Sequence, residues 1–421
     1  MSKVQSSISY QYEFSDDKWK LATGNYFGRL TGHSLHYIGP YSGSFPPELV
    51  RYFLEKYSDE NNVVLDPFSG RGTTGLEAVL SNRKTIVNDA NPLAFVYSHA
   101  KLFPFSSKEV DSFLDHIPFR MNNYSSQISE EKSLELESYY HKDTLLEIRN
   151  LRHFLRNDDS PMGYFVKALV AGTSQGNRIS NLSVTMSALI CFSAKYMRKW
   201  SEKTGTYPEY REVHSRLVAK AERLEKDRFD FRRDSSLYCG DAQDLKIEDN
   251  SIDLVITSPP YFNVINYAYD NRVRLWMIGS DYKTTHKSLM NTSSIPKYTD
   301  FIHNTMSELF RVLKDDSWAV IVVGDVKRKS SSDRNKNNYT IINTAEIVAK
   351  SAEKQGFRVD KIINDVLPEE GGTCGRATSL TKNFNVSIDR CVVLKKGNPE
   401  VRLTSIKWTK KKPKRKKSKK N

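Results

Sequence analysis

The sequence predicts an α/β fold with a doubly wound, mostly parallel sheet and a helical insertion. Short apolar runs bounded by turn residues alternate with amphipathic helical stretches, which is typical of parallel strands joined by crossover helices. Two of these runs, 63–68 and 252–257, lead into turns rich in glycine and proline respectively. Ligands of open α/β sheets bind where such turns leave the carboxyl ends of strands. We therefore expect the functional site at these two turns.

Seven strands are predicted from short, β-branched apolar runs. They cover residues 63–68, 84–89, 236–241, 252–257, 318–323, 357–364 and 389–394, and the last two should form an edge pair. Helices are expected before the first strand, at 48–56, and between later strands, at 300–313 and 341–355. Pro47 suits the first turn of the first helix, because the missing N–H would have no helical partner there.

The first turn reads Asp66-Pro67-Phe68-Ser69-Gly70-Arg71-Gly72-Thr73-Thr74-Gly75 and opens into a helix. Glycine is needed where the backbone must approach a ligand without an intervening Cβ. The spacing also fits a dinucleotide fingerprint, with Asp89 near the place of the ribose-binding acid. Asp66 argues against that interpretation, since a carboxylate would repel a pyrophosphate but attract an ammonium group. No lysine follows Gly75 in the pattern of a nucleotide triphosphatase.

The second turn reads Ser258-Pro259-Pro260-Tyr261 and directly follows a predicted buried strand. Two consecutive prolines forbid both helix and further strand pairing, so the chain must leave the sheet in a stiff, extended form. The turn presents a hydroxyl group, a carbonyl group and an aromatic face in fixed relation. This arrangement suits a site that holds a planar base by its exocyclic amino group.

Together the two turns resemble the amino-methyltransferases of nucleic acid, which carry (Ser/Asp/Asn)-Pro-Pro-(Tyr/Phe) and Asp-Pro-Phe-x-Gly-x-Gly-Thr-Thr. The resemblance implies the class I methyltransferase fold, Rossmann-like with a seven-stranded sheet, and S-adenosylmethionine as the cofactor. It implies catalytic roles for Ser258, Pro259, Pro260 and Tyr261. It also implies a cofactor site without metal, formed by Phe45, Asp66, Pro67, Phe68, Gly70, Gly72, Thr73, Thr74, Asp89 and Asp241.

Within that cofactor site, the resemblance implies separate roles for three acids. Asp66 would face the ammonium group of the methionine part, Asp89 would bind the ribose hydroxyls, and Asp241 would meet the adenine amino group. Phe45 belongs to a segment, 43–50, that covers the cofactor in relatives. Three acids at the ends of successive strands are harder to explain as turn residues than any one of them alone.

The identity of the target is predicted from Ser258, because serine at this position accompanies cytosine N4 in most relatives. The expected activity is site-specific methylation of cytosine N4 in double-stranded DNA with a flipped target base, in a restriction-modification or related defence system. A cognate restriction endonuclease is a possible partner. Adenine N6 in DNA is the alternative, followed by an RNA amino group and by a catalytically silent DNA-binding subunit. The chain has no Pro-Cys pair, which argues against carbon-5 methylation of cytosine.

The chain organisation predicts four segments, with the glycine turn first and the proline turn second. Residues 1–94 and 236–400 should form the methyltransferase domain, and 401–421 a basic, disordered tail. The segment 95–235 is too long for a plain loop. Leu145, Ile148, Leu151 and Leu155 recur in it at helical spacing. We expect a helical insertion that is a candidate for target recognition.

Composition and charge are those expected of a nucleic-acid-binding protein of the bacterial or archaeal cytoplasm, associated with the nucleoid. The net charge is +14, and nine cations lie in residues 410–420, where a phosphate backbone is the natural partner. No apolar run is long enough to span a membrane, and the first 25 residues lack a signal-peptide core. The polar stretch 327–338 is expected to be a mobile loop near the site.

Overall fold

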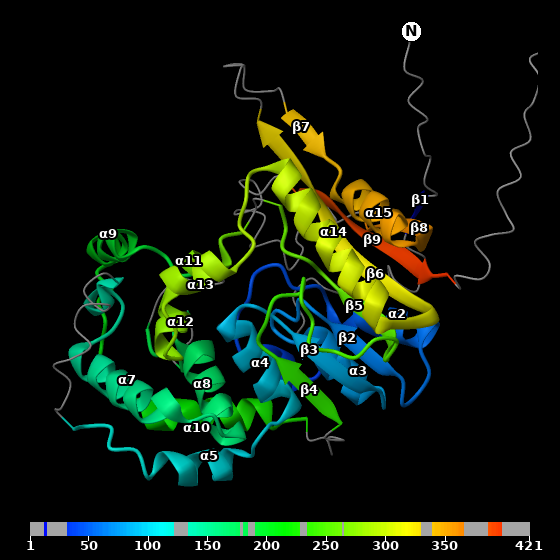
Figure 1. Cartoon of the computed structure of the whole chain (residues 1–421). Coiled ribbons are helices and arrows are strands. Elements are labelled where there is room, and N and C mark those ends of the chain that lie inside the picture. The colour runs from blue at the N-terminus through cyan, green and yellow to red at the C-terminus, as the bar shows by residue number, and fades with distance from the viewer. Residues whose placement is uncertain are drawn as a thin grey trace, which may run out of the picture.

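A computed structural model of the chain describes residues 12–14, 32–121, 134–176, 180–183, 190–227, 234–262, 265–329, 339–365 and 386–397. Within these ranges the core of the fold is one nine-stranded sheet (Figure 1). Its strands are β1 (Tyr12–Phe14), β2 (Val63–Asp66), β3 (Lys84–Asn88), β4 (Ser235–Tyr238), β5 (Ile252–Thr257), β6 (Leu313–Lys329), β7 (Tyr339–Ile342), β8 (Phe357–Asp365) and β9 (Val386–Lys396).

The strand order is β1-β8-β9-β6-β5-β2-β3-β4, and β7 pairs separately with β6. Strands β4, β3, β2, β5 and β6 pair in parallel, whereas β9 is antiparallel to both β6 and β8. Leaving out the added strands β1 and β7, this is the order of a class I S-adenosylmethionine-dependent methyltransferase. The predicted fold class is therefore confirmed.

The strand boundaries differ from prediction mainly around β6. This strand extends well beyond the predicted 318–323, and its end pairs with β7, which was not predicted. Residues 327–329 therefore belong to a strand, and the remainder of the expected loop lies outside the described residues. Polar residues at both ends of β6 hide its length from a search for apolar runs. Strand β1 adds to β8, so β8 and β9 do not form the edge that was expected.

Helices cover both faces of the sheet. Helices α2 (Pro47–Tyr57) and α3 (Thr73–Leu80) pack on one face, and α14 (Ile295–Val312) and α15 (Thr344–Gln355) pack on the other. Successive side chains of a strand point to opposite faces of the sheet. In β5, Leu254 packs with α2 on one face, and Val255 packs with α14 on the other. Both faces are buried, which is why the predicted strands are continuous apolar runs.

The long connection between β3 and β4 is helical, as predicted. It contains α4 (Pro92–Leu102), α5 (Ser107–Leu114), α7 (Lys142–Phe154), α8 (Pro161–Thr173), α9 (Ala194–Thr204) and α10 (Val213–Leu224), with 3-10 turns at Leu136–Ser138 and Leu155–Asn157. The residues predicted at helical spacing are all buried: Leu145, Ile148 and Leu151 lie in α7, and Leu155 lies in the 3-10 turn that follows it.

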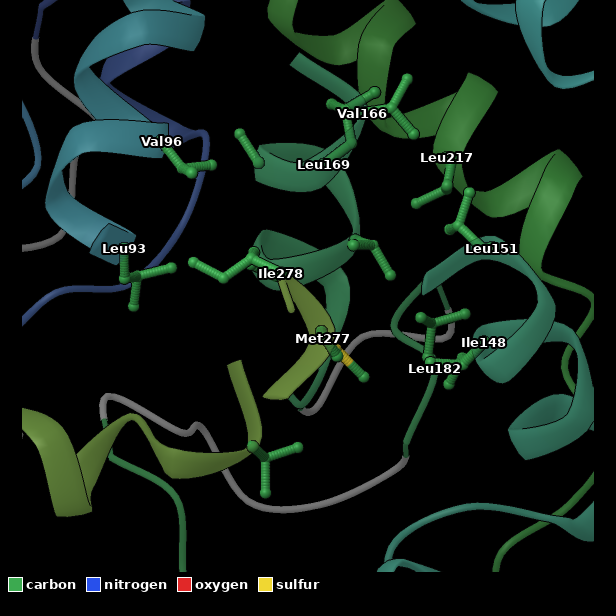
Figure 2. Close-up of a cluster of buried hydrophobic side chains, with 14 of the residues drawn as sticks. Leu93, Val96, Ile148, Leu151, Val166, Leu169, Leu182, Leu217, Met277 and Ile278 are labelled. Atoms are coloured by element: carbon green, nitrogen blue, oxygen red, sulfur yellow. The ribbon is translucent and has the colours of Figure 1, made fainter. Parts of the chain in front are cut away.

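The core of this helical part also receives a helix from the second half of the chain. Figure 2 shows side chains of α4, α7, α8 and α10 converging with Met277 of α12 (Arg272–Met277) and the adjacent Ile278. Helix α12 is flanked by the short helices α11 (Tyr267–Asp270) and α13 (Tyr282–Ser288). The chain that leaves the proline turn is therefore anchored in the insertion. Among the helices within the described ranges, none is long and apolar enough to cross a membrane.

Candidate active site

A cavity of about 580 Å³, which includes open solvent, lies where both predicted turns leave the sheet. Strands β2 and β5 are adjacent and parallel, so their carboxyl ends, and the turns that follow, meet at one edge. The cavity brings together seven of the predicted site residues. These are Phe45, Phe68, Gly70, Thr73, Asp89, Ser258 and Pro260.

The two central glycines of the first turn serve different purposes. Both have positive φ angles, +51° at Gly70 and +75° at Gly72. A Cβ on Gly70 would lie 3.3 Å from the ring of Tyr41 and would narrow the cavity. A Cβ on Gly72 would lie 2.8 Å from Ser98 Oγ, so this glycine allows the turn to pack against α4. Gly70 lines the cavity, whereas Gly72 does not.

Asp89, at the end of β3, presents a carboxylate to the cavity. The backbone N–H groups of Gly70 and Asn91 donate hydrogen bonds to its two oxygens, at 2.9 and 2.8 Å. Burial raises the pKa of Asp89 to about 6, and these two hydrogen bonds limit the rise. The carboxylate is therefore mainly ionised at neutral pH, and its remaining lone pairs suit hydroxyl donors.

Asp66 lies behind the cavity wall rather than in it. Its side chain is 1% exposed, and Oδ1 accepts hydrogen bonds from Thr257 Oγ1 at 2.6 Å and from the Phe68 N–H at 3.1 Å. Burial raises the pKa of this carboxyl group to about 7. The bond to Thr257 joins the end of β2 to the residue before Ser258, so Asp66 ties the two turns together. The position of the carboxylate does not support the expected contact with an ammonium group.

The proline turn is held from below by α14. The hydroxyl group of Tyr298 donates a hydrogen bond of 3.1 Å to the Pro260 carbonyl. Ser258 and Pro260 line the cavity. Among the described residues, none hydrogen-bonds to the Ser258 side chain, so its hydroxyl group is available to a ligand.

Two tyrosines other than the predicted one form the aromatic wall of the cavity. Tyr41 and Tyr267 stack with ring centroids 5.9 Å apart and an interplanar angle of 28°. Burial raises the pKa of both hydroxyl groups, so both rings are neutral. Tyr261, predicted to provide the stacking face, is not part of the cavity lining.

Five further predicted residues lie near the cavity without lining it. Thr74 supports the turn from beneath, donating a hydrogen bond of 3.2 Å to the Ile256 carbonyl. Asp241 is exposed and accepts a hydrogen bond from the Gln243 N–H at 2.9 Å. The turn before it remains close, because the Gly240 N–H donates to the Asp89 carbonyl at 3.2 Å. The full set outside the lining is Pro67, Gly72, Thr74, Pro259 and Asp241, together with Asp66 and Tyr261 described above.

Nine lining residues lie outside the set of site residues predicted above, and only some of them had a usable signal. Gly43 and Ser44 belong to the same segment as Phe45, and Asn91 follows Asp89 at a strand end, so these three residues could have been included. Leu289 and Met290 follow α13 and belong to no recognisable motif. Only the packing of α12 and α13 brings them to the site, so the sequence could not predict them. The additional lining residues are Tyr41, Ser42, Gly43, Ser44, Ser69, Asn91, Tyr267, Leu289 and Met290.

Comparison with known proteins shows similarity on both sides of the insertion. The sequence profile of the family described as DNA methylase matches residues 4–101 and 252–421, which is more than half of the chain. The profile therefore includes both turns and leaves out most of the helical insertion.

Two relatives are type II methyltransferases. M.MjaII of Methanocaldococcus jannaschii is 25% identical over 136 residues, which cover 32% of this chain and 25% of the relative. M.BsoBI of Geobacillus stearothermophilus is 23% identical over 317 residues, which cover 65% of this chain and 60% of the relative. The matches thus span a quarter and three fifths of the lengths of these relatives.

Among solved structures, an S-adenosylmethionine-dependent methyltransferase from Methanosarcina mazei aligns with 82% of this chain and 97% of its own. The sequence identity is 10% and the TM-score 0.33. The family assignment depends on the sequence profile, which matches the two segments that carry the glycine and proline turns. This chain belongs to the N6/N4 DNA methylase family.

Proposed function

We propose that the chain transfers a methyl group from S-adenosylmethionine to the exocyclic N4 amino group of cytosine in DNA. The observation that carries this proposal is one cavity lined by both turns, to which the proline turn contributes Ser258, the glycine turn Gly70, and the end of β3 Asp89. A family whose members methylate DNA amino groups fits this arrangement.

The residues present fit the cofactor. Thr73 Oγ1 is buried at the cavity and has no hydrogen-bond partner among the described residues, and the missing Cβ of Gly70 leaves space beside Tyr41. Asp89 would accept hydrogen bonds from the ribose hydroxyls, and Phe45 and Phe68 would provide apolar walls. S-adenosylmethionine, when bound, supplies an electrophilic methyl group.

The chain's own part in the reaction is to hold and activate the amino group of the base. That amino nitrogen is a weak nucleophile, because its lone pair is delocalised into the ring. Ser258 Oγ, which lines the cavity, would accept one N–H, and the carbonyl of the adjacent Pro259, which lies beside the lining, would accept the other. These two bonds would draw the nitrogen toward a tetrahedral form and make the lone pair available. Preorganised polar groups of this kind contribute roughly tenfold to a thousandfold each in rate.

The target base must leave the duplex to reach this cavity, at a cost of about a few kcal/mol. Stacking of the flipped base on an aromatic side chain returns about 1–3 kcal/mol. Tyr267, whose ring lines the cavity seven positions beyond Pro260, is the candidate for that contact. Tyr261 remains the alternative that the motif suggests.

Cytosine N4 is preferred over adenine N6 because of the serine at the first position of the proline turn. Adenine N6 is the second candidate, because both targets are amino groups that need the same two acceptors. Two relatives bear the name of type II methyltransferases, which favours a restriction-modification setting with a cognate endonuclease. RNA is a third possible substrate.

The test is nucleoside analysis of DNA from cells that express the chain, by liquid chromatography and mass spectrometry. N4-methylcytosine with N6-methyladenine at background is the expected result. The Ser258→Ala variant should lose at least about tenfold in methyl transfer while its affinity for S-adenosylmethionine is kept. Ser236→Ala, on the exposed edge strand β4, is the matched control. N6-methyladenine alone would replace the cytosine assignment, and methylated RNA without methylated DNA would change the substrate class.

A further inference from the structure

A group of aromatic side chains lies on α11 and α13, which follow the proline turn, and on the start of α9 in the insertion. Its members are Phe192, Tyr196, Tyr269 and Tyr282, which we call the aromatic shelf. Phe192 and Tyr196 stack at 4.8 Å between centroids, and Tyr269 meets Tyr282 edge-on at 6.4 Å. Tyr196 is 41% exposed and Tyr269 44%. These rings occur in contacting pairs, which distinguishes them from the single apolar side chains that are normally scattered over a surface.

One buried arginine joins the two halves of this shelf. The Arg272 guanidinium group donates hydrogen bonds to the Cys191 and Tyr269 carbonyls, at 2.8 and 2.9 Å, and a further one to the Phe192 carbonyl. It also stacks under the Tyr269 ring, 4.4 Å from its centroid. Arg272 is 5% exposed, so these contacts are shielded from water. The two pairs of rings are therefore fixed relative to each other.

The shelf is connected to the active site through α11. Tyr267, at the start of this helix, lines the cavity, and Tyr269 follows two residues later on an exposed part of the helix. The Cys191 N–H donates to the Asp270 carbonyl at 2.7 Å, which holds the chain before α9 against α11. Figure 1 shows α9, α11 and α13 together on the same side of the molecule.

Positive charge accompanies the exposed rings. Helix α9 carries four exposed cations and one acid, Glu202. Lys283, on α13, lies 6.0 Å from the centroid of the Tyr282 ring. Aromatic faces interleaved with cations match a nucleic acid strand, because bases stack on the rings while phosphates pair with the cations. Three of these cations are Lys195, Lys199 and Lys203, and the fourth, Arg198, pairs with Glu135.

We infer that the aromatic shelf binds the DNA strand next to the flipped target base, with Tyr269 and Tyr196 stacking on bases and the α9 cations contacting phosphates. This inference rests on the proposed function only for the presence of a flipped base. The net positive charge of α9 favours DNA over a protein partner with an apolar surface. Arg272 is the positioning residue, since it holds both pairs of rings without being exposed itself.

The test compares Tyr269→Ala and Tyr196→Ala with the wild type in methyl transfer to sheared, unmethylated genomic DNA. Each variant should raise the KM for DNA by about fivefold to a hundredfold, the range expected when one base loses its stacking partner. The KM for S-adenosylmethionine should stay within about twofold. Tyr269→Phe should recover most of the affinity, because the ring is kept. Tyr207→Ala is the control, since Tyr207 is 63% exposed but follows α9 outside the shelf.

A second measurement needs no turnover and separates this inference from the proposed function. A fluorescent single-stranded oligonucleotide of mixed sequence should bind the wild type several-fold more tightly than Tyr269→Ala, at fixed salt. Equal binding of the oligonucleotide by wild type and Tyr269→Ala would contradict the shelf as a DNA-binding surface. A parallel rise in the KM for DNA and the KM for S-adenosylmethionine would also contradict it, because such a rise indicates a structural defect. If the wild-type protein binds the oligonucleotide but methylates no DNA, the proposed function is contradicted, whereas the inference about the aromatic shelf still holds.

Discussion

Gly70 has a φ of +51° and lies on the cavity wall. Glycine is favoured there for two reasons: it adopts the positive φ angle without strain, and its missing side chain leaves space in the cavity. In Gly70→Val, the branched side chain would enter the space beside Tyr41 that the cofactor needs. Affinity for S-adenosylmethionine, measured by isothermal titration, should therefore fall at least tenfold. This corresponds to a loss of about 1.4 kcal/mol or more in binding free energy.

The control for that variant separates backbone strain from loss of the binding space. Gly205 has a φ of +66°, and no atom of the described residues lies within 4 Å of an added Cβ, so Gly205→Val carries the strain without blocking the cavity. Its affinity for the cofactor should equal that of the wild type. Wild-type affinity in a folded Gly70→Val protein would remove the glycine turn from the cofactor site.

Asp66 predicts a pH dependence of stability. Its pKa is about 7 in the folded chain against 3.8 when exposed, so the unfolded chain releases this proton first as the pH rises. Stability is therefore lost between about pH 4 and pH 7, by up to about 4 kcal/mol. Asp66→Asn keeps an acceptor for Thr257 and Phe68 but cannot ionise.

Urea denaturation of both proteins between pH 5 and pH 8 measures this effect. The free energy of unfolding of the variant, relative to that of the wild type, should increase as the pH rises through this range. Other titrating groups are shared and cancel in the difference. A difference that does not change with pH would show that Asp66 does not titrate as described.

At the scale of elements, a buried charged group joins the segment before the cavity to the helix that follows the glycine turn. Glu77 of α3 accepts hydrogen bonds from His36 Nε2 at 2.6 Å and Arg51 Nε at 2.5 Å. Lys101 Nζ lies 3.4 Å from His36 Nδ1. Burial lowers the pKa of His36, and Lys101 lowers it further, so the imidazole is neutral and donates to the carboxylate.

Glu77→Ala should therefore destabilise the fold by about 1–3 kcal/mol, because it leaves the buried His36 N–H without its acceptor and also removes the partner of the partly exposed Arg51. Thermal or urea unfolding measures the loss. Glu55→Ala, an exposed acid on α2, should stay within about 0.5 kcal/mol of the wild type. Equal effects of the two substitutions would mean that the network contributes little to stability.

The elements that sequence could predict are those whose signal is local. Strand β5 matches its predicted bounds because every residue from Ile252 to Thr257 belongs to a buried strand between breakers. Strand β7 was missed because four residues next to a polar stretch form a strand only by pairing with β6. In the site, Gly70 and Ser258 could be predicted from motifs. Tyr41 and Met290 depend on helix packing, which no local pattern reports.

At the scale of the whole molecule, charge outside the described residues should add affinity for DNA without adding specificity. Truncation after Trp408 removes the nine cations of residues 410–420. The slope of log K for DNA against log salt should become less steep by about 0.9 for each phosphate that the tail no longer neutralises. Preference among DNA sequences should be kept. An unchanged slope would assign the tail to something other than DNA, such as targeting.

The pairing of β2 with β5 also has a consequence for how the chain is made. Val64 lies opposite Leu254, so 190 residues must be synthesised after the first strand before its partner exists. At about 5–20 residues per second, this interval lasts roughly ten to forty seconds. During it, the nascent chain carries the glycine turn beside an unpaired strand edge, which is a template for wrong pairing. Helices α4 to α10 are all made in that interval, but their shared core is completed only by α12, which follows the proline turn, so the sheet and the insertion both wait for the same late segment.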